Sequence, residues 1–268
     1  MIVLITGSKG YVGKNLTYYL LKKGLNVIPI DRKIGSEVEE LTQQKLTSLG
    51  VNHIVHLSAL SGIKSCSDNL KQAYHDNISS TLKIFNSAEE TYIPVTFASS
   101  QAAKTPKANY YALTKYMAEC EAEKINFKNK TNIKVLRFTN IYGGMDYLET
   151  KSTVISNFIK AKKENLPIKI NGDGSQQRDF IHVEDICDAI FKSIVITNIK
   201  IDKPIDIGTG IATSIKKLAE IFNHKFTYDL KSSMIGTDRN VADTYNAYKL
   251  LGFKANINLN EQIRKEYF

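Results

Sequence analysis

A tyrosine and a lysine four residues apart, Tyr111 and Lys115, are the residues of this 268-residue chain best suited to proton transfer. On a helix that runs on through Glu119, this spacing places the phenol and the ammonium on one face. A tyrosine with an ordinary pKa of about 10 is a weak base at neutral pH unless a nearby positive charge favours the phenolate. Lys115 can supply that charge, so the pair predicts a general acid/base unit. The same spacing also occurs in surface pairs on amphipathic helices, which is the alternative interpretation.

Three glycines near the N-terminus suit the binding of a phosphate group. Gly7, Gly10 and Gly13 follow the apolar run 2–5 and lead into a helix-like segment, 15–23. Such a turn needs glycine for its tightness, for close approach of backbone to phosphate and for packing of the helix on the strand. The pattern predicts a dinucleotide site, and Asp31 at the end of the next apolar run supports it. The alternative is a glycine-rich turn that binds nothing.

The elements that must position these residues alternate in type along the first half of the chain. Strand-like apolar runs are separated by segments with helical periodicity, and the runs are 2–5, 27–30, 53–57, 95–98 and 133–138. This alternation predicts βαβ units and an α/β fold with a doubly wound parallel sheet. Pro29 lies inside one run, although a proline in a central strand removes a hydrogen bond.

The second half of the chain contains longer, irregular connections at 144–150, 171–177 and 231–240. Loops of this kind carry ligands more often than packing, so we expect a smaller C-terminal substrate-binding region. A helix expected at 185–196 and a strand expected at 204–207 would return the chain to the sheet. The two regions are therefore expected to be interleaved.

The composition excludes several classes of protein. With 43% hydrophobic residues and only short apolar runs, we expect a globular cytoplasmic protein without a signal peptide or a membrane span. Cys66, Cys120 and Cys187 are too scattered for a disulfide framework or a zinc site. The net charge of +9 comes from dispersed lysines, which indicates a solvated basic surface or an anionic small-molecule ligand rather than nucleic acid.

Together these motifs resemble the extended short-chain dehydrogenase/reductase family, the NAD-dependent nucleotide-sugar epimerases and dehydratases. Further similar stretches cover most of the chain: His-Leu-Ser-Ala at 56–59, the segment 65–77, Leu-Arg-Phe-Thr-Asn-Ile-Tyr-Gly at 136–143, and Gly-Asp-Gly-Ser-Gln-Gln-Arg-Asp-Phe-Ile-His-Val at 172–183. The resemblance implies a Rossmann-type NAD-binding domain at 1–143, joined by about 179–210. The substrate-binding region would then comprise 144–178 and 211–268.

The resemblance also implies how the cofactor is bound. The three glycines would surround the pyrophosphate, with backbone N–H groups contributed by Tyr11 and Val12. Asp31 would bind the adenosine ribose hydroxyls and favour NAD, while the adjacent Arg32 and Lys33 leave NADP open. The other cofactor contacts that the family implies are Leu57, Ala59, Ser99, Tyr111 and Lys115, the last through the nicotinamide ribose.

For catalysis, the resemblance implies Ser100, Tyr111 and Lys115. Ser100 would hydrogen-bond the reacting sugar oxygen; the alternative is a hydroxyl that ties the strand end to its own backbone.

Three further residues are expected to bind the substrate. Asn140 and Arg178 would hold the substrate diphosphate, the arginine through paired N–H donors. Arg239 is a looser candidate for a second phosphate contact, and a solvated loop arginine is the alternative.

The chain departs from the family pattern next to the catalytic serine. Gln101 and Ala102 stand where dehydratases have acidic residues, and glutamine cannot transfer a proton, so 4,6-dehydration is disfavoured. Only ten residues, 101–110, separate Ser100 from Tyr111, so the loop on the substrate side is short. The segment after Asp31 is short as well, which leaves Glu37 as a candidate for the acidic adenine contact.

Histidine does not indicate a metal site. His56, His75 and His182 have no partner at metal-ligand spacing, so we expect structural roles for them and no bound metal.

We therefore expect an NAD-dependent nucleotide-sugar epimerase that acts at C4 of a hexose through a transient ketosugar. The alternatives are an NAD(P)H-dependent 4-keto-nucleotide-sugar reductase and a nucleotide-binding protein without activity. A homodimer through the helices that hold 68–88 and 110–124, and a role in polysaccharide biosynthesis, are expected from the family alone.

Overall fold

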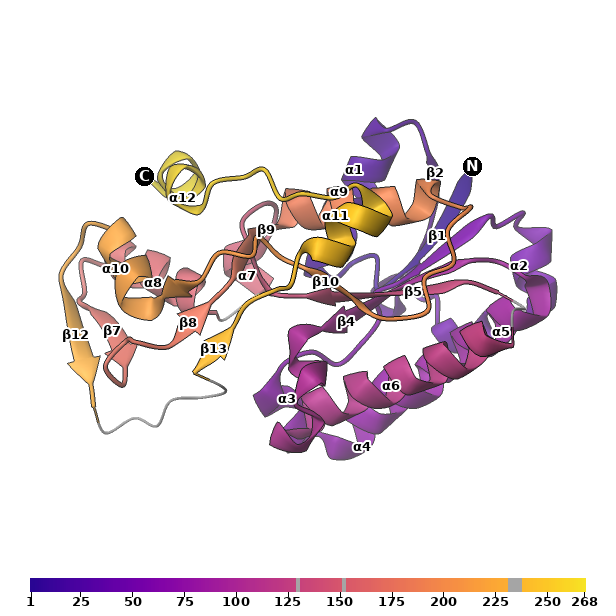
Figure 1. Cartoon of the computed structure of the whole chain (residues 1–268), viewed down its shortest axis with the longest axis horizontal. Helices are drawn as coiled ribbons and strands as arrows, with labels where there is room; N and C mark the ends of the chain where they lie inside the picture. The colour runs from indigo at the N-terminus through magenta and orange to yellow at the C-terminus, as the bar shows by residue number, and fades with distance from the viewer. Residues whose placement is uncertain (129–130, 151–152, 231–237) are drawn as a thin grey trace.

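A six-stranded parallel sheet forms the centre of the computed structural model, which describes residues 1–128, 131–150, 153–230 and 238–268 (Figure 1). The strand order is β10-β5-β4-β3-β1-β2. The strands are β1 (Ile2–Thr6), β2 (Asn26–Ile30), β3 (His53–His56), β4 (Val95–Ser100), β5 (Ile133–Phe138) and β10 (Ile205–Ile207). The predicted α/β class with a doubly wound parallel sheet is confirmed. Because all the strands are parallel, their carboxyl ends meet at one edge, where such folds bind ligands.

Helices cover both faces of this sheet (Figure 1). One layer contains α1 (Tyr11–Lys22), α9 (Val183–Val195) and α11 (Tyr245–Leu251). The other contains α2 (Gln43–Ser48), α3 (Ile63–Asp68), α4 (Leu70–Tyr74), α5 (Ser80–Thr91) and α6 (Tyr110–Phe127). No helix in the described ranges has the length and apolarity of a membrane span.

A π-helix at His75–Ser79 joins α4 to α5 without a gap, and the interruption in the segment 68–88 lies at Asn69, between α3 and α4. Such π-turns are rare and occur frequently at functional sites. Four short 3-10 helices lie in connections: η1 (Arg32–Ile34), η2 (Val38–Glu40), η4 (Gln101–Lys104) and η5 (Pro106–Ala108). The last two form most of the short loop between β4 and α6.

The other strands form three small sheets beside the central one. They are β6 (Asn140–Tyr142) with β9 (Phe180–His182), β7 (Ile168–Asn171) with β12 (Phe226–Asp229), and β8 (Gln177–Arg178) between β11 (Thr213–Ser214) and β13 (Arg239–Asn240). The accompanying helices are α7 (Tyr147–Thr150), α8 (Val154–Lys163), α10 (Ile215–Ile221) and α12 (Leu259–Tyr267). As predicted, the chain returns to the central sheet near 204–207, through β10. The connection expected at 231–240 lies mostly outside the described residues.

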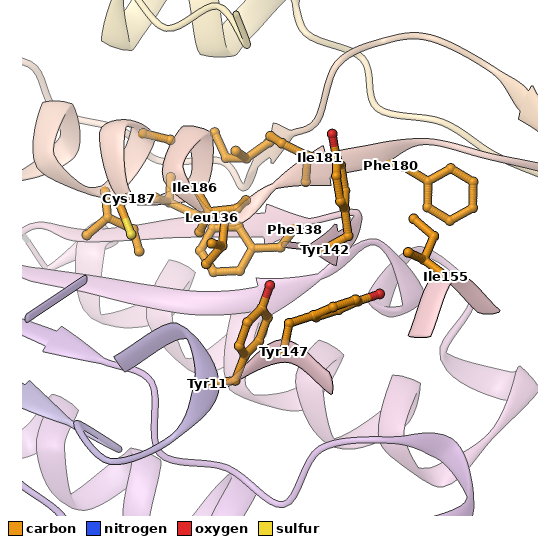
Figure 2. Packing of buried hydrophobic residues seen from close by; sticks show 14 of the residues in the cluster. Tyr11, Leu136, Phe138, Tyr142, Tyr147, Ile155, Phe180, Ile181, Ile186 and Cys187 are labelled. Carbon is orange, nitrogen blue, oxygen red and sulfur yellow. The ribbon is translucent and has the colours of Figure 1, made fainter. Parts of the chain in front are cut away.

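A hydrophobic cluster joins the central sheet to the smaller sheets (Figure 2). It includes Tyr11 of α1, Phe138 of β5, Tyr147 of α7 and Ile155 of α8, all of them buried. The ring centroids of Tyr11 and Tyr147 are 5.6 Å apart. Because one cluster spans both regions, apolar burial fixes the smaller region on the sheet.

Pro29 lies in β2, as the apolar pattern predicts, and it is exposed. β2 is the last strand of the central sheet. An edge strand tolerates a proline because one side of its backbone has no neighbouring strand to bond.

The C-terminal helix α12 is attached to the rest of the chain by a hydrogen bond between Glu266 and His182. Glu266 Oε1 lies 2.8 Å from Nε2 of His182, whose side chain is 0% exposed, while that of Glu266 is 22% exposed. Burial by itself raises the pKa of Glu266, but hydrogen bonds from His182 and Gln262 outweigh burial and hold that pKa at about 2.

Replacement of Glu266 by Gln should lower the free energy of unfolding by about 1 kcal/mol at pH 7, after allowance for solvent screening. Since the folded pKa is depressed, this contribution is complete above the ordinary pKa of 4.5 and is lost as the pH falls towards 2. Urea unfolding of both proteins across this range would measure it, with Glu261→Gln on the exposed side of α12 as the control. A difference that stays constant down to pH 2.5 would contradict the assignment.

Candidate active site

The turn between β1 and α1 is packed so closely that side chains do not fit at two of its glycines. A Cβ on Gly13 would lie 2.1 Å from the carbonyl oxygen of Gly7, and a Cβ on Gly7 would lie 2.8 Å from the backbone nitrogen of Ser58. Gly7 also has a φ of +68°, which L-residues with a side chain rarely adopt. The turn therefore presents only backbone in front of α1, as close contact with a pyrophosphate requires.

Tyr11 has separate roles for its side chain and its backbone. The side chain is buried, and its hydroxyl donates a hydrogen bond to the carbonyl oxygen of Gly143, 2.6 Å away. The backbone N–H groups of Tyr11 and Val12 lie in the first turn of α1, where N–H groups have no partner within the helix. The geometry thus suits the predicted phosphate contact through these backbone groups.

Asp31 lies at the carboxyl end of β2, next to the glycine turn. Its Oδ2 accepts a hydrogen bond from the N–H of Lys9 and its Oδ1 accepts one from the N–H of Lys33, both at 2.9 Å. A carboxylate can accept further bonds, so these two fix its orientation and leave capacity for ribose hydroxyls. Leu57 and Ala59 follow β3, the strand beside β1, and are half-buried. The residues present therefore fit the dinucleotide site that the sequence predicts.

Arg32, also predicted to contact the cofactor, forms an ion pair within the chain. Its Nη2 lies 2.9 Å from Oδ1 of Asp76 in the π-helix. This ion pair could not be predicted from local sequence patterns, because the two residues belong to elements far apart in the chain.

Ser100, Tyr111 and Lys115 come together where β4 ends and α6 begins. Ser100 lies close enough to Tyr111 to act on the pKa of its phenol. The Nζ of Lys115, a residue that is 4% exposed, donates to the carbonyl oxygen of Ala98 at 2.8 Å. Ser100 Oγ also accepts the N–H of Ala102 at 3.2 Å. The alternative interpretation of Ser100, a hydroxyl that ties the strand end to its own backbone, is thus observed, and its contact with a sugar oxygen stays a prediction.

Burial shifts the pKa values of the tyrosine and the lysine in opposite directions. It raises the pKa of Tyr111 to about 12, although nearby Ser100 acts to lower it. It lowers the pKa of Lys115 to about 8, although Glu119 acts to raise it. The phenol is thus the stable form of Tyr111 at neutral pH. The positive charge of Lys115, which the sequence analysis expects to favour the phenolate, is not sufficient by itself. A further positive charge is needed before Tyr111 can accept a proton.

Ser99 contacts a different part of the chain from Ser100, as consecutive strand residues do. Its Oγ donates to Oε1 of Glu119 at 2.5 Å, and the same oxygen accepts a bond from Nε of Arg137 at 2.9 Å. The hydroxyl of Ser99 is therefore engaged in a buried network under α6. Its role beside the cofactor stays a prediction.

The three predicted phosphate-binding residues lie close together on the small strands. Both the backbone N–H and the Nδ2 of Asn140 bond to the carbonyl oxygen of Asp179, each at 3.0 Å. The preceding residue, Arg178, lies on β8, and Arg239 lies on the adjacent β13, where its Nη1 donates to Oε1 of Gln177 at 2.8 Å. The fold thus brings the backbones of these residues together from distant parts of the sequence, with Arg178 and Arg239 on neighbouring strands but one position out of register.

Asp179 was not among the residues predicted for the site, yet its side chain bonds to two later segments of the chain. It is 0% exposed, and its Oδ1 accepts bonds from the backbone N–H and the hydroxyl of Thr209, at 2.9 and 2.6 Å. Its Oδ2 accepts the N–H groups of Gly210 and Ala242, at 2.9 and 3.2 Å. A Cβ on Gly208 would lie 2.5 Å from the same oxygen. The only sequence signal was its place beside Arg178 in the family-like stretch.

The histidines have structural partners. The ring nitrogens of His56 lie 2.7 Å from Thr6 Oγ1 and 3.0 Å from Thr81 Oγ1. Burial, together with Lys115, lowers the pKa of His56 to about 3, so its ring is neutral. The described residues contain no group of three or more His, Cys, Asp or Glu side chains that could hold a metal ion.

Comparison with known proteins agrees with this geometry. Residues 3–208 match the NAD dependent epimerase/dehydratase family. The chain belongs to this family.

Two curated relatives and one solved structure extend the match. The putative UDP-glucose 4-epimerase of Methanocaldococcus jannaschii is 25% identical over 300 residues, which are 98% of this chain and 96% of that protein. The UDP-glucose 4-epimerase of Mycoplasma genitalium is 25% identical over 322 residues, with 98% and 94% covered. The structure of MoeE5 in complex with UDP-glucose and NAD matches at a TM-score of 0.85 and 25% identity, covering 100% of this chain and 97% of that one.

These findings confirm several predictions from the sequence. The family, the Rossmann-type fold, the enzyme class and the dependence on NAD are established. The roles of individual residues and the bounds of the two regions stay predictions.

Replacement of Asp179 by Asn should lower the free energy of unfolding by about 2–4 kcal/mol, because the new NH₂ group would face N–H donors that now bond to a carboxylate. Denaturant unfolding would measure the loss. Asp173→Asn, an exposed carboxylate earlier in the same segment, is the control and should cost less than about 1 kcal/mol. Equal losses in the two variants would show that Asp179 is not a special constraint.

Proposed function

We propose that the chain is an NAD-dependent epimerase that inverts C4 of the hexose in a nucleotide diphosphate sugar, with a UDP-sugar as the first candidate substrate. The observation that carries the proposal is the placement of Ser100 at the end of β4 and of Tyr111 and buried Lys115 on α6, at the edge of the sheet that also holds the glycine turn. The names of the relatives support the same reaction.

The residues of the site divide the chemistry among them. NAD, when bound, supplies the acceptor and later the donor of the hydride. Tyr111 takes the proton of the C4 hydroxyl during oxidation and gives it back during reduction. Ser100, which lies near Tyr111, donates a hydrogen bond to the carbonyl oxygen of the ketosugar. Lys115 holds positive charge beside the phenol and binds the nicotinamide ribose.

Epimerisation also requires that one end of the substrate is held firmly while the other end turns. Asn140 and the two arginines, Arg178 and Arg239, bind the diphosphate from strands that Asp179 fixes in place. The ketosugar then presents its other face to the returning hydride without leaving the site. Strong contacts to the nucleotide and weak contacts to the sugar meet this requirement.

The residue after the catalytic serine argues against dehydration. Gln101 is 4% exposed, and its Nε2 has no hydrogen-bond partner among the described residues. A carboxamide cannot exchange a proton at neutral pH, so elimination of water from the sugar lacks its acid and base.

A homodimer in the cytoplasm is part of the same proposal. The outer face of α6 exposes Tyr110, Tyr116 and Met117, at 43%, 42% and 38%. Large apolar side chains in a group on one helix are typical of a surface that binds a partner. Sedimentation analysis would test whether the chain is a dimer. The role in polysaccharide biosynthesis is proposed from the family alone.

Tyr111→Phe should reduce turnover by about 10²- to 10⁴-fold, because the C4 oxygen loses its proton acceptor. Cofactor binding should survive, since the glycine turn and Asp31 are unchanged. The control is Tyr110→Phe, the exposed tyrosine next to it on α6, which should retain turnover. Turnover retained in Tyr111→Phe would discard the mechanism.

The reaction itself can be tested on freshly purified protein. Bound nucleotide is released by heat and identified by mass spectrometry, and the protein is incubated with UDP-, dTDP-, GDP- and CDP-sugars. An epimerase releases NAD and forms a product of equal mass without net change in cofactor. Consumption of NADH or NADPH with 4-keto sugars only would identify a reductase instead, and no hydride transfer with any sugar would indicate a protein without activity.

A further inference from the structure

A small cleft at the adenosine end of the cofactor site carries an excess of negative charge. Four of the side chains that line it are acidic: Asp31, Glu37, Glu39 and Asp76. Among the described residues that line the cleft, Arg32 is the only basic one. Whether Arg32 is available to a ligand therefore decides what charge the cleft accepts.

Arg32 is held by Asp76. The distance from Arg32 Nη2 to Asp76 Oδ1 is 2.9 Å, and the side chain of Asp76 is 8% exposed while that of Arg32 is 56% exposed. Gln72 Nε2 donates to the same carboxylate oxygen at 2.6 Å. Burial by itself raises the pKa of Asp76, but the bonds from Arg32, His75 and Gln72 outweigh burial and lower it. Asp76 is thus a fixed, ionised partner for the guanidinium.

The segment that carries Asp76 is itself rigidly placed. The next residue of the π-helix, Asn77, donates from Nδ2 to the carbonyl oxygen of Leu60 and to Oγ1 of Thr114, both at 3.0 Å. Thr114 lies on α6, next to Lys115. Because the π-helix is braced against the catalytic helix, Asp76 cannot follow Arg32 towards a ligand without breaking these bonds.

A phosphate on the 2′-oxygen of the adenosine ribose needs a basic partner and is repelled by carboxylates. The residue after the ribose-binding Asp is a natural partner, since an arginine nearby accommodates this phosphate in NADP-binding folds. In this chain that residue is Arg32, and it is already paired.

We propose that Asp76 is a positioning residue for cofactor selectivity, which holds Arg32 away from the 2′-phosphate and thereby makes the chain select NAD over NADP. Asp76 acts through Arg32, and the pair adds to the selectivity that Asp31 provides. The inference rests on the dependence of the family on NAD. It does not depend on which sugar is the substrate, so it fails separately from the proposed reaction.

The test measures binding directly. The full chain, freed of bound nucleotide, is dialysed against equal concentrations of NAD and NADP, and the bound ratio is read by mass spectrometry. Asp76→Asn should raise the bound share of NADP relative to NAD by about tenfold to a hundredfold, as expected for one released charged hydrogen bond. Asp68→Asn is the matched control, because it removes an exposed carboxylate that pairs with Lys64 outside the cleft.

A second variant distinguishes whether Asp76 acts by positioning Arg32 or only by repelling the 2′-phosphate. In Asp76→Asn combined with Arg32→Gln, the gain in NADP binding should disappear, since it depends on the released guanidinium. A gain that persists in the double variant would show that Asp76 only repels phosphate, and this would overturn the proposal. No gain in Asp76→Asn would overturn it as well.

Arg32→Gln alone keeps the proposal testable if Asp76→Asn does not fold. With Asp76 intact, Arg32 contributes nothing to NADP binding, so the weak binding of NADP should stay within about twofold of the unaltered chain. A tenfold loss of NADP binding in this variant would show that Arg32 already reaches the 2′-phosphate, and the proposal would be wrong.

Discussion

The buried carboxylate of Asp179 is the constraint on which the substrate side of the site depends. It accepts hydrogen bonds from Thr209, Gly210 and Ala242, so two segments from the C-terminal third of the chain converge on one side chain. Its backbone carbonyl oxygen accepts hydrogen bonds from the backbone N–H and from the side-chain Nδ2 of Asn140. A charge buried in this way is stable only while its donors stay in place. The positions of Asn140 and of the segments at 209–210 and 242 are therefore linked to one another through one residue, Asp179.

A second carboxylate links the catalytic loop to the same region. Lys104, in the short loop after Ser100, bonds through Nζ to Asp206 of β10, and Asp206 also accepts the N–H of Asp243 at 3.0 Å. The loop is too short to extend far over the substrate. It is held in place by its bond to β10, the strand of the central sheet that comes last in the sequence. The interleaving of the two regions thus supplies support that the shortened loop lacks.

The features that could be predicted from the sequence are those made by residues close together in the chain, and contacts between distant residues could not be predicted. The glycine turn, Asp31 and the Tyr111/Lys115 pair depend on spacing within one strand, turn or helix, and local pattern was enough to find them. The Arg32–Asp76 pair joins a turn after β2 to a π-helix, and no periodicity connects the two. The role of Asp179 likewise arises only from tertiary contacts.

The pKa of Tyr111 explains why these parts must act together. A pKa of about 12 means that ionising the phenol at pH 7 costs about 7 kcal/mol in the chain by itself. Lys115, with its pKa lowered to about 8, is still mostly charged at neutral pH, but its ammonium bonds to the carbonyl oxygen of Ala98. In the proposed reaction, the oxidised cofactor would supply the further positive charge that the phenolate needs. Without that charge the phenol is the favoured form. The protonation state of Tyr111 would then follow the redox state of the site, as the proposed reaction, which runs in both directions, requires.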